Sequence, residues 1–155
     1  MNNSLNNVFK EKLEQISNII DKLGIESTII QPKDDIIFLL LSIPPENNIS
    51  RDTQLYYIPI DENNDKTKFL IQIVSSFDIF DKDIPLSKLQ TICDIINAKT
   101  PMGTLFIDHE DKGLYCRYTM IDVNKDELEE TLKIILDIYI MTLSMTCNLI
   151  FTIID

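Results

Sequence analysis

The feature that most limits how this chain can fold is an uncharged stretch near its C-terminus, residues 138–154. Its length reaches the lower bound for a membrane-spanning helix. A soluble helix that is buried on more than one side has the same composition. Ser144 and Asn148 within the stretch, and the charged Asp137 just before it, favour the buried helix over a tail anchor. We therefore expect a core helix here.

The N-terminal part of the chain carries a helical pattern. Between Leu5 and Leu23 apolar residues recur at spacings of three and four, and Gly24 follows the last of them. This predicts an amphipathic helix that stops at a glycine. Helix-start residues over 83–90, and an apolar stripe that ends before Asn97, predict a second, short helix.

A third helix is predicted to begin near Lys125, because Asn124 with Glu127 three residues later is typical of a helix cap. This helix runs toward Asn148 or beyond. The end of the chain, residues 148–154, is rich in β-branched residues and could instead form a strand.

Short apolar runs between Pro, Asn and Gly breaks predict the strands of the fold. Five runs have this pattern: residues 35–41, 54–60, 69–74, 104–108 and 114–120. A polar turn over 61–66 joins the second run to the third. The last two runs flank a polar loop that ends in Gly113, which predicts a hairpin whose glycine takes a positive φ. On the final strand one face should carry Leu114, Cys116, Tyr118 and Met120, and the other Tyr115, Arg117 and Thr119.

The predicted order is α-β-β-β-α-β-β-α, with no long linker and no internal repeat. With 155 residues, 45% hydrophobic and 25% charged, the chain has the size and composition of one ordinary domain. We therefore predict a single α+β domain over residues 1–155, with one antiparallel sheet packed by helices.

The charge of the chain narrows the choice of partners. Its formal net charge is -11, which repels nucleic-acid phosphates and anionic lipid headgroups. Nucleic acid is therefore not expected as a partner, and a membrane is disfavoured. Residues 1–7 lack the basic and apolar segments of a signal peptide, and three cysteines without CxxC spacing fit a reducing compartment. We expect a cytoplasmic protein.

No cofactor or metal site is predicted. The three glycines are too far apart for a nucleotide-binding loop, and the single histidine, His109, has no second imidazole to share a metal with. The cysteines Cys93, Cys116 and Cys147 are expected to be small buried apolar residues. Residues 122–126 imitate the start of a calcium loop, but the glycine and the glutamate that such a loop needs further on are missing.

Two acidic clusters could supply the paired carboxylates of a hydrolase. One comprises Asp78, Asp81 and Asp83, and the other Asp108, Glu110 and Asp111. Both lie in predicted loops, where exposed carboxylates keep ordinary pKa values and solvate the chain. We therefore expect no catalytic residues and no enzymatic activity.

The third helix has apolar residues on two neighbouring sides. One side carries Leu128, Leu132, Ile135 and Tyr139. The second side carries Ile134, Ile138, Met141, Met145 and Leu149. In a domain of this size the sheet covers one side, which leaves the other for a second subunit, a client segment or the first helix. We predict that the second side is a protein-binding or dimer surface.

Three segments of the chain resemble the YbjN family. They are a helix ending in Asn over 89–97, a Pro-x-Gly sequence before a strand that ends in Asp over 100–108, and a glycine followed by a strand with Tyr, Arg and Tyr over 113–118. The resemblance implies a type III secretion chaperone-like fold and a small acidic cytoplasmic protein that is often dimeric. Secretion chaperones with that fold bind an unfolded client segment across apolar surface patches.

Together these observations predict a non-enzymatic protein-binding module, chaperone-like or adaptor-like, that buries apolar segments of a partner protein. Its expected partners are a second copy of itself, as a homodimer, and an unidentified client. The alternative is a regulatory domain that senses a small molecule in a pocket between sheet and helices, with Tyr57, Tyr115 and Tyr118 as polar handles.

Overall fold

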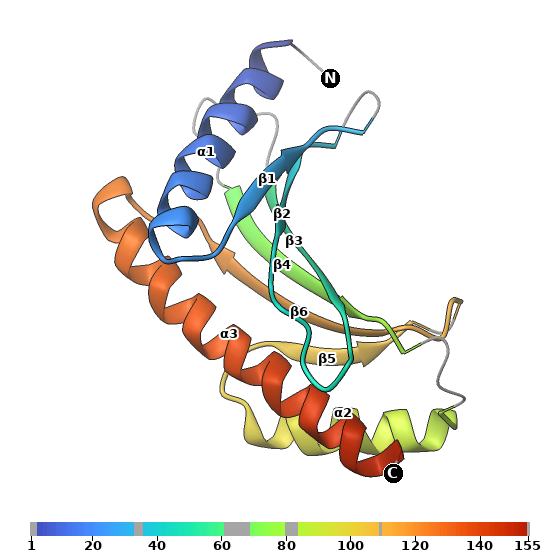
Figure 1. Cartoon of the computed structure of the whole chain (residues 1–155). Helices are drawn as coiled ribbons and strands as arrows, with labels where there is room; N and C mark the ends of the chain where they lie inside the picture. Colours follow the sequence, from blue (N-terminus) through green and yellow to red (C-terminus); the bar gives the residue numbers. More distant parts are fainter. Residues whose placement is uncertain (1–2, 33–35, 61–68, 80–83, 109, 155) are drawn as a thin grey trace.

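Figure 1 shows the computed structural model of the chain, which describes residues 3–32, 36–60, 69–79, 84–108 and 110–154. The helices are α1 (Asn3–Lys22), α2 (Leu86–Lys99) and α3 (Lys125–Ile154). The strands are β1 (Ser27–Ile30), β2 (Phe38–Leu41), β3 (Arg51–Pro59), β4 (Phe69–Phe77), β5 (Thr104–Ile107) and β6 (Leu114–Ile121). The predicted α+β class is confirmed. The turn predicted over 61–66 lies outside the described residues.

The strands form one sheet in the order β1-β2-β3-β4-β6-β5, and every neighbouring pair is antiparallel. The two longest strands, β3 and β4, pair along their whole length, from Arg51 opposite Phe77 to Pro59 opposite Phe69. The chain between β4 and β6 forms α2 and the edge strand β5. The sheet is therefore a four-stranded meander extended by β6 and β5.

The element order has one strand more than the sequence pattern predicts, because β1 precedes the first predicted strand. β1 is a four-residue edge strand without a fully buried side chain, so it lacks the apolar alternation by which a strand is recognised. Its position is fixed by pairing with β2 and by α1, where Asp21 Oδ1 accepts hydrogen bonds from the backbone N–H and the hydroxyl of Ser27 at 3.1 and 3.0 Å.

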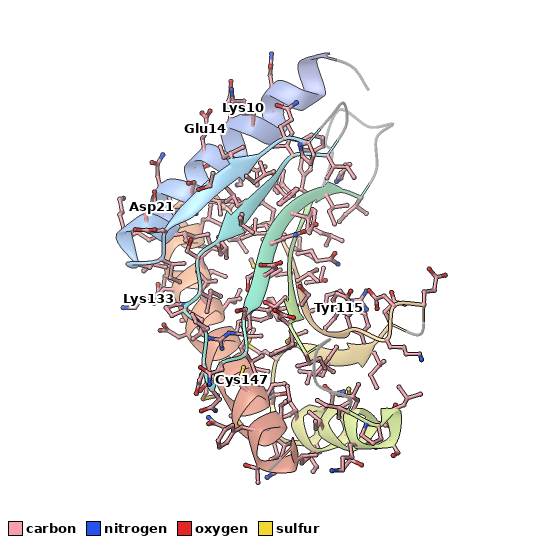
Figure 2. All side chains as sticks on the ribbon, turned by 45° about the vertical axis from the view of Figure 1, so that its right-hand side comes forward. Lys10, Glu14, Asp21, Tyr115, Lys133 and Cys147 are labelled. Atoms are coloured by element: carbon pink, nitrogen blue, oxygen red, sulfur yellow. The ribbon has the colours of Figure 1, made fainter. Side chains whose placement is uncertain are left out.

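The three helices lie on the same side of the sheet in both views (Figures 1 and 2). α1 contacts β1, β2 and β3, α2 contacts β5, and α3 contacts both other helices. The core between the helices and the sheet includes the fully buried Leu13, Ile16, Leu55, Ile73, Ile92, Leu132 and Leu143. The opposite side of the sheet has no described helix over it.

α1 ends as predicted, at a glycine stop. Gly24 has φ +85°, the N–H of Gly24 donates to the carbonyl of Asp21 at 3.0 Å, and the N–H of Ile25 donates to the carbonyl of Ile20 at 3.3 Å. This pair of bonds is the Schellman motif, in which glycine avoids the steric cost of left-handed backbone. The chain can therefore reverse sharply from α1 into β1.

The prediction for Gly113 is wrong, because the left-handed residue in this hairpin is Lys112, with φ +57°. Gly113 serves another purpose. A Cβ at this position would lie 2.6 Å from Cε2 of Tyr115 and 2.8 Å from Oδ1 of Asp111. The missing side chain lets the Tyr115 ring fold over the turn and bond to Asp111.

α3 is one continuous helix to Ile154, so the strand considered for residues 148–154 does not form. Three threonines of this helix, Thr142, Thr146 and Thr152, donate their hydroxyl hydrogen bonds to carbonyls four residues earlier. These bonds satisfy the polar groups within the helix. A largely apolar helix can therefore carry Thr142 and Thr146 at buried positions.

Candidate protein-binding surface

The inner side of α3 forms the centre of the core, as predicted. Leu128, Leu132, Ile135 and Tyr139 are at most 5% exposed. The Tyr139 hydroxyl donates to the carbonyl of Cys116 at 2.8 Å and lies 3.0 Å from Oγ of Ser75. Burial raises the pKa of Tyr139 above its ordinary value, so the phenol stays neutral.

The second predicted side of α3 is open to solvent. Ile134 is 52% exposed and Met141 is 49% exposed. Ile138, Met145 and Leu149 are half-buried, and the last two also pack against the core. We call these five residues the α3 ridge. At spacings of three and four they form a single apolar row along the helix, in which Ile134 and Met141 are the exposed members.

The polar residues beside the α3 ridge anchor the turn between β2 and β3. Oε1 of Glu46 accepts hydrogen bonds from the Ser144 hydroxyl at 2.8 Å and from the Asn148 amide at 3.1 Å. Asn47 donates to Oδ1 of Asn148 at 2.8 Å. Asn47 and Asn48 both have positive φ, at +52° and +58°, as a two-residue hairpin turn requires. Ser144 and Asn148 of α3 therefore make intramolecular contacts.

Arg51 is the buried charge of this region, with a side chain that is only 4% exposed. Nη2 donates to the carbonyl of Pro44, and Nη1 lies 3.7 Å from Oε2 of Glu46. Nε and Nη1 have no hydrogen-bond partner among the described residues. Arg51 also lines a cavity of about 640 Å³ together with Ile25, Leu41, Ile43, Pro44 and Ile140.

The three tyrosines predicted as polar handles do not meet in one pocket. Tyr57 and Tyr118 face the helices, and Tyr115 lies on the other side of the sheet, away from α3 (Figure 2). The Tyr57 hydroxyl donates to Oδ2 of Asp122 at 2.7 Å, and the Lys12 ammonium lies 3.0 Å from Oδ1 of the same carboxylate. These contacts fasten α1 to the sheet.

Asp122 is also the first position of the calcium-like stretch. Its carboxylate is already engaged by a phenol and an ammonium group. Among the described residues no group of three His, Cys, Asp or Glu side chains could hold a metal ion.

The acidic residues of the β5–β6 hairpin shape its turn. Asp108 Oδ1 accepts from the N–H of Glu110 at 2.8 Å, and Asp111 accepts from the N–H of Gly113 at 2.6 Å and from the Tyr115 hydroxyl. The Tyr115 bond is the main cause that lowers the pKa of Asp111. These carboxylates have structural partners. His109, Asp81 and Asp83 lie outside the described residues.

The cysteines are buried, as predicted. Burial raises the pKa of Cys93 to about 11 and that of Cys116 to about 12. A thiol with such a pKa is almost entirely protonated near neutral pH, and the thiolate is the reactive form. Cys93 and Cys116 therefore act as packing groups.

The side of the sheet without helices forms a second large surface (Figure 1). We call it the open face. It comprises the outward residues Thr28 and Ile30 of β1, Phe38 and Leu40 of β2, Asp52, Gln54, Tyr56 and Ile58 of β3, Leu70, Gln72, Val74 and Ser76 of β4, Thr104 and Phe106 of β5, and Tyr115, Arg117, Thr119 and Ile121 of β6. The outward Gln72 and Ser76 of β4, which alternate with the buried Ile71, Ile73 and Phe77, are a partial signal for this face in the sequence.

Aromatic pairs organise the open face. The rings of Phe38 and Tyr56 lie 5.4 Å apart, and those of Phe106 and Tyr115 stack at 5.5 Å. The Arg117 guanidinium lies 5.2 Å from the centre of the Phe106 ring, within the range of a cation–π contact. The open face is therefore apolar and aromatic at both ends.

One helix in the described part of the chain, α3 over Asp126–Ile153, is long and apolar enough to cross a membrane. Core helices of soluble proteins pass the same test. None of the family models, curated proteins or solved structures compared with this chain matches it.

Proposed function

We propose that this chain is a non-enzymatic protein-binding module, a YbjN-like and chaperone-like protein of the cytoplasm that forms a homodimer and binds a client on the α3 ridge. The exposure of Ile134 and Met141 in one row with three half-buried apolar residues carries this proposal. Such a row on a folded domain is typical of an interaction site.

The energetics favour an apolar client segment. Each large side chain of the ridge that becomes fully buried contributes up to about 2 kcal/mol in favour of binding. Met141 and Met145 are unbranched and adapt their shape, which suits clients of varied sequence. The net charge of -11 keeps the loaded complex soluble.

The test measures how well the protein prevents a heat-unfolded model protein from aggregating, by light scattering. We expect the wild type to suppress aggregation and the variant Ile134→Gln/Met141→Gln to lose most of that activity. The matched control is Val8→Gln, at a 48% exposed position on α1, which should behave as the wild type. Equal suppression by all three proteins, or none by the wild type, contradicts client binding on the ridge.

The cavity beside Arg51 favours a small-molecule sensor as the second candidate function. Its volume of about 640 Å³ lies within the range of ligand pockets. Nε of Arg51, which has no hydrogen-bond partner among the described residues, can donate to a carboxylate. A thermal-shift screen with small carboxylic acids tests it. A dose-dependent rise in Tm that is lost in Arg51→Met supports the sensor, and the absence of any rise contradicts it.

A further inference from the structure

The open face differs from the rest of the molecule in its charge. The chain has a net charge of -11, yet only two of the outward residues of the described strands are charged, Asp52 and Arg117. Their charges are opposite, so the strand residues of the face carry no net charge, and Asp78 borders the face beside Asp52. A largely apolar surface with balanced charges on an acidic protein is a place where two copies can approach with little repulsion.

The two charged residues lie on either side of the centre of the face. Asp52 is opposite Ser76 of β4, and Arg117 is opposite Val74 of the same strand. They are separated by two strand spacings and by two residues along the strand, which corresponds to about 12 Å between their Cα atoms. A twofold axis that passes between them places each residue over the oppositely charged one of a second copy.

The area of the face also suits a second copy. Six adjacent strands at about 4.8 Å spacing and about 20 Å length cover roughly 600 Å² in flat projection, and the relief of the side chains raises the accessible area toward the ~800 Å² per partner of a standard interface.

We propose that the open face is the surface through which two copies of this chain associate, packed sheet against sheet, with Asp52 of each copy opposite Arg117 of the partner subunit. This inference rests on the homodimer of the proposed function and adds its interface. The aromatic groups around Phe106 and Phe38 become buried at the contact, which supplies the affinity, and the two charge pairs set the register.

The test is the mass in solution, by light scattering after gel filtration, of the wild type, Asp52→Arg and Arg117→Asp. Both side chains are exposed, so both variants should keep the wild-type circular dichroism spectrum. We expect a dimeric wild type. Each single variant places like charges opposite each other twice per dimer, so its dissociation constant should rise at least about tenfold.

The decisive measurement is the mass of a mixture of the two single variants. In the mixed dimer the arginine introduced in one variant faces the aspartate introduced in the other, and the unchanged Arg117 of the first faces the unchanged Asp52 of the second. Both pairs are then of opposite charge, so dimers should re-form. The double variant Asp52→Arg/Arg117→Asp should also dimerise. If the single variants dimerise as the wild type does, or if the mixture stays monomeric, the proposed interface is wrong.

The α3 variant Ile134→Gln/Met141→Gln separates this inference from the proposed function. We expect it to remain dimeric. If it becomes monomeric while the charge variants stay dimeric, the copies associate through the α3 ridge and the open-face interface is overturned. A monomeric wild type overturns the interface and the homodimer together, whereas client binding on the ridge is judged by the aggregation assay alone.

Discussion

The side chain of Asn97 makes both of the hydrogen bonds that a further strand would make with Leu105. Its Nδ2 donates to the Leu105 carbonyl at 3.0 Å, and its Oδ1 accepts from the Leu105 N–H at 2.8 Å. Leu105 lies in β5, at one edge of the sheet. An unpaired sheet edge can pair with strands of other chains. The Asn97 amide of α2 occupies the backbone groups of Leu105 and so protects this edge.

Replacing Asn97 by alanine should expose this edge. We expect Asn97→Ala to lower the free energy of unfolding by about 1–3 kcal/mol, because a half-buried donor and acceptor lose their partners. It should also aggregate faster. Urea unfolding measures the first effect and light scattering the second. Gln90→Ala, on the same helix with an exposed side-chain bond to Asp94, is the control and should change little. Stability equal to that of the control would contradict a role for the Asn97 amide.

Gly113 should tolerate a side chain only when the Tyr115 ring is absent. We expect Gly113→Ala to destabilise the protein by about 1–3 kcal/mol, because the added methyl overlaps the ring. In a Tyr115→Ala background the same substitution should cost clearly less, which a double-mutant cycle measures. Equal costs in both backgrounds would show that the contact with Asp111, and not the ring, requires glycine.

Glu46 should matter chiefly because it neutralises Arg51. Glu46→Ala leaves a buried guanidinium without its carboxylate, and we expect a loss of about 3 kcal/mol in the free energy of unfolding. The variant Glu46→Ala/Arg51→Met removes the charge as well and should be more stable than Glu46→Ala alone. Denaturant unfolding of both variants is the measurement. A double variant less stable than the single one would mean that Arg51 contributes more through its bond to Pro44.

The Asp111–Tyr115 pair should make stability depend on pH at both extremes. The hydrogen bond to Asp111 is the main cause that raises the pKa of Tyr115 to about 12. A raised pKa gives stability that is complete below the ordinary value of about 10 and is lost as the pH rises toward 12. The lowered pKa of Asp111 gives stability that is present above about pH 4 and is lost as the pH falls further.

The difference in Tm between the wild type and Tyr115→Phe isolates this pair. It should be constant between these limits and shrink at both ends. A difference in Tm that does not vary with pH would show that the hydrogen bond does not couple protonation of the pair to folding. Titration of the phenol by ultraviolet absorbance gives an independent value of its pKa.

The sequence predicts elements whose residues carry a local pattern. The spacing from Leu5 to Leu23 and the glycine after it are sufficient for α1. The cap pattern at Asn124 predicts the start of α3, and the uncharged residues 138–154 predict its buried part. β1 is missed because its four residues depend for their position on Asp21 and on β2, which no local pattern records. The role of Gly113 is missed because it arises from a ring two residues away.

The candidate surfaces are predictable to different degrees. The α3 ridge follows from helical spacing alone, since residues three and four apart share a face. The open face depends on which side of the sheet the helices occupy, and the apolar runs in β2 and β3 read equally well as strands covered on both faces. Likewise, Ser144 and Asn148 are visible as a polar stripe, but their partner Glu46 lies about a hundred residues earlier in the chain.

The strand order also determines how the chain can assemble. β1 to β4 are joined as successive hairpins, so their pairing requires only nearby segments to meet. β6 pairs with β4, and residues 78–113 separate the two strands in the chain. Bringing the ends of this segment together costs chain entropy before any contact between the two strands forms. The formation of α2 and β5 within this segment brings the end of β4 and the start of β6 closer together. We expect the meander to form early and the β4–β6 pairing to limit the folding rate.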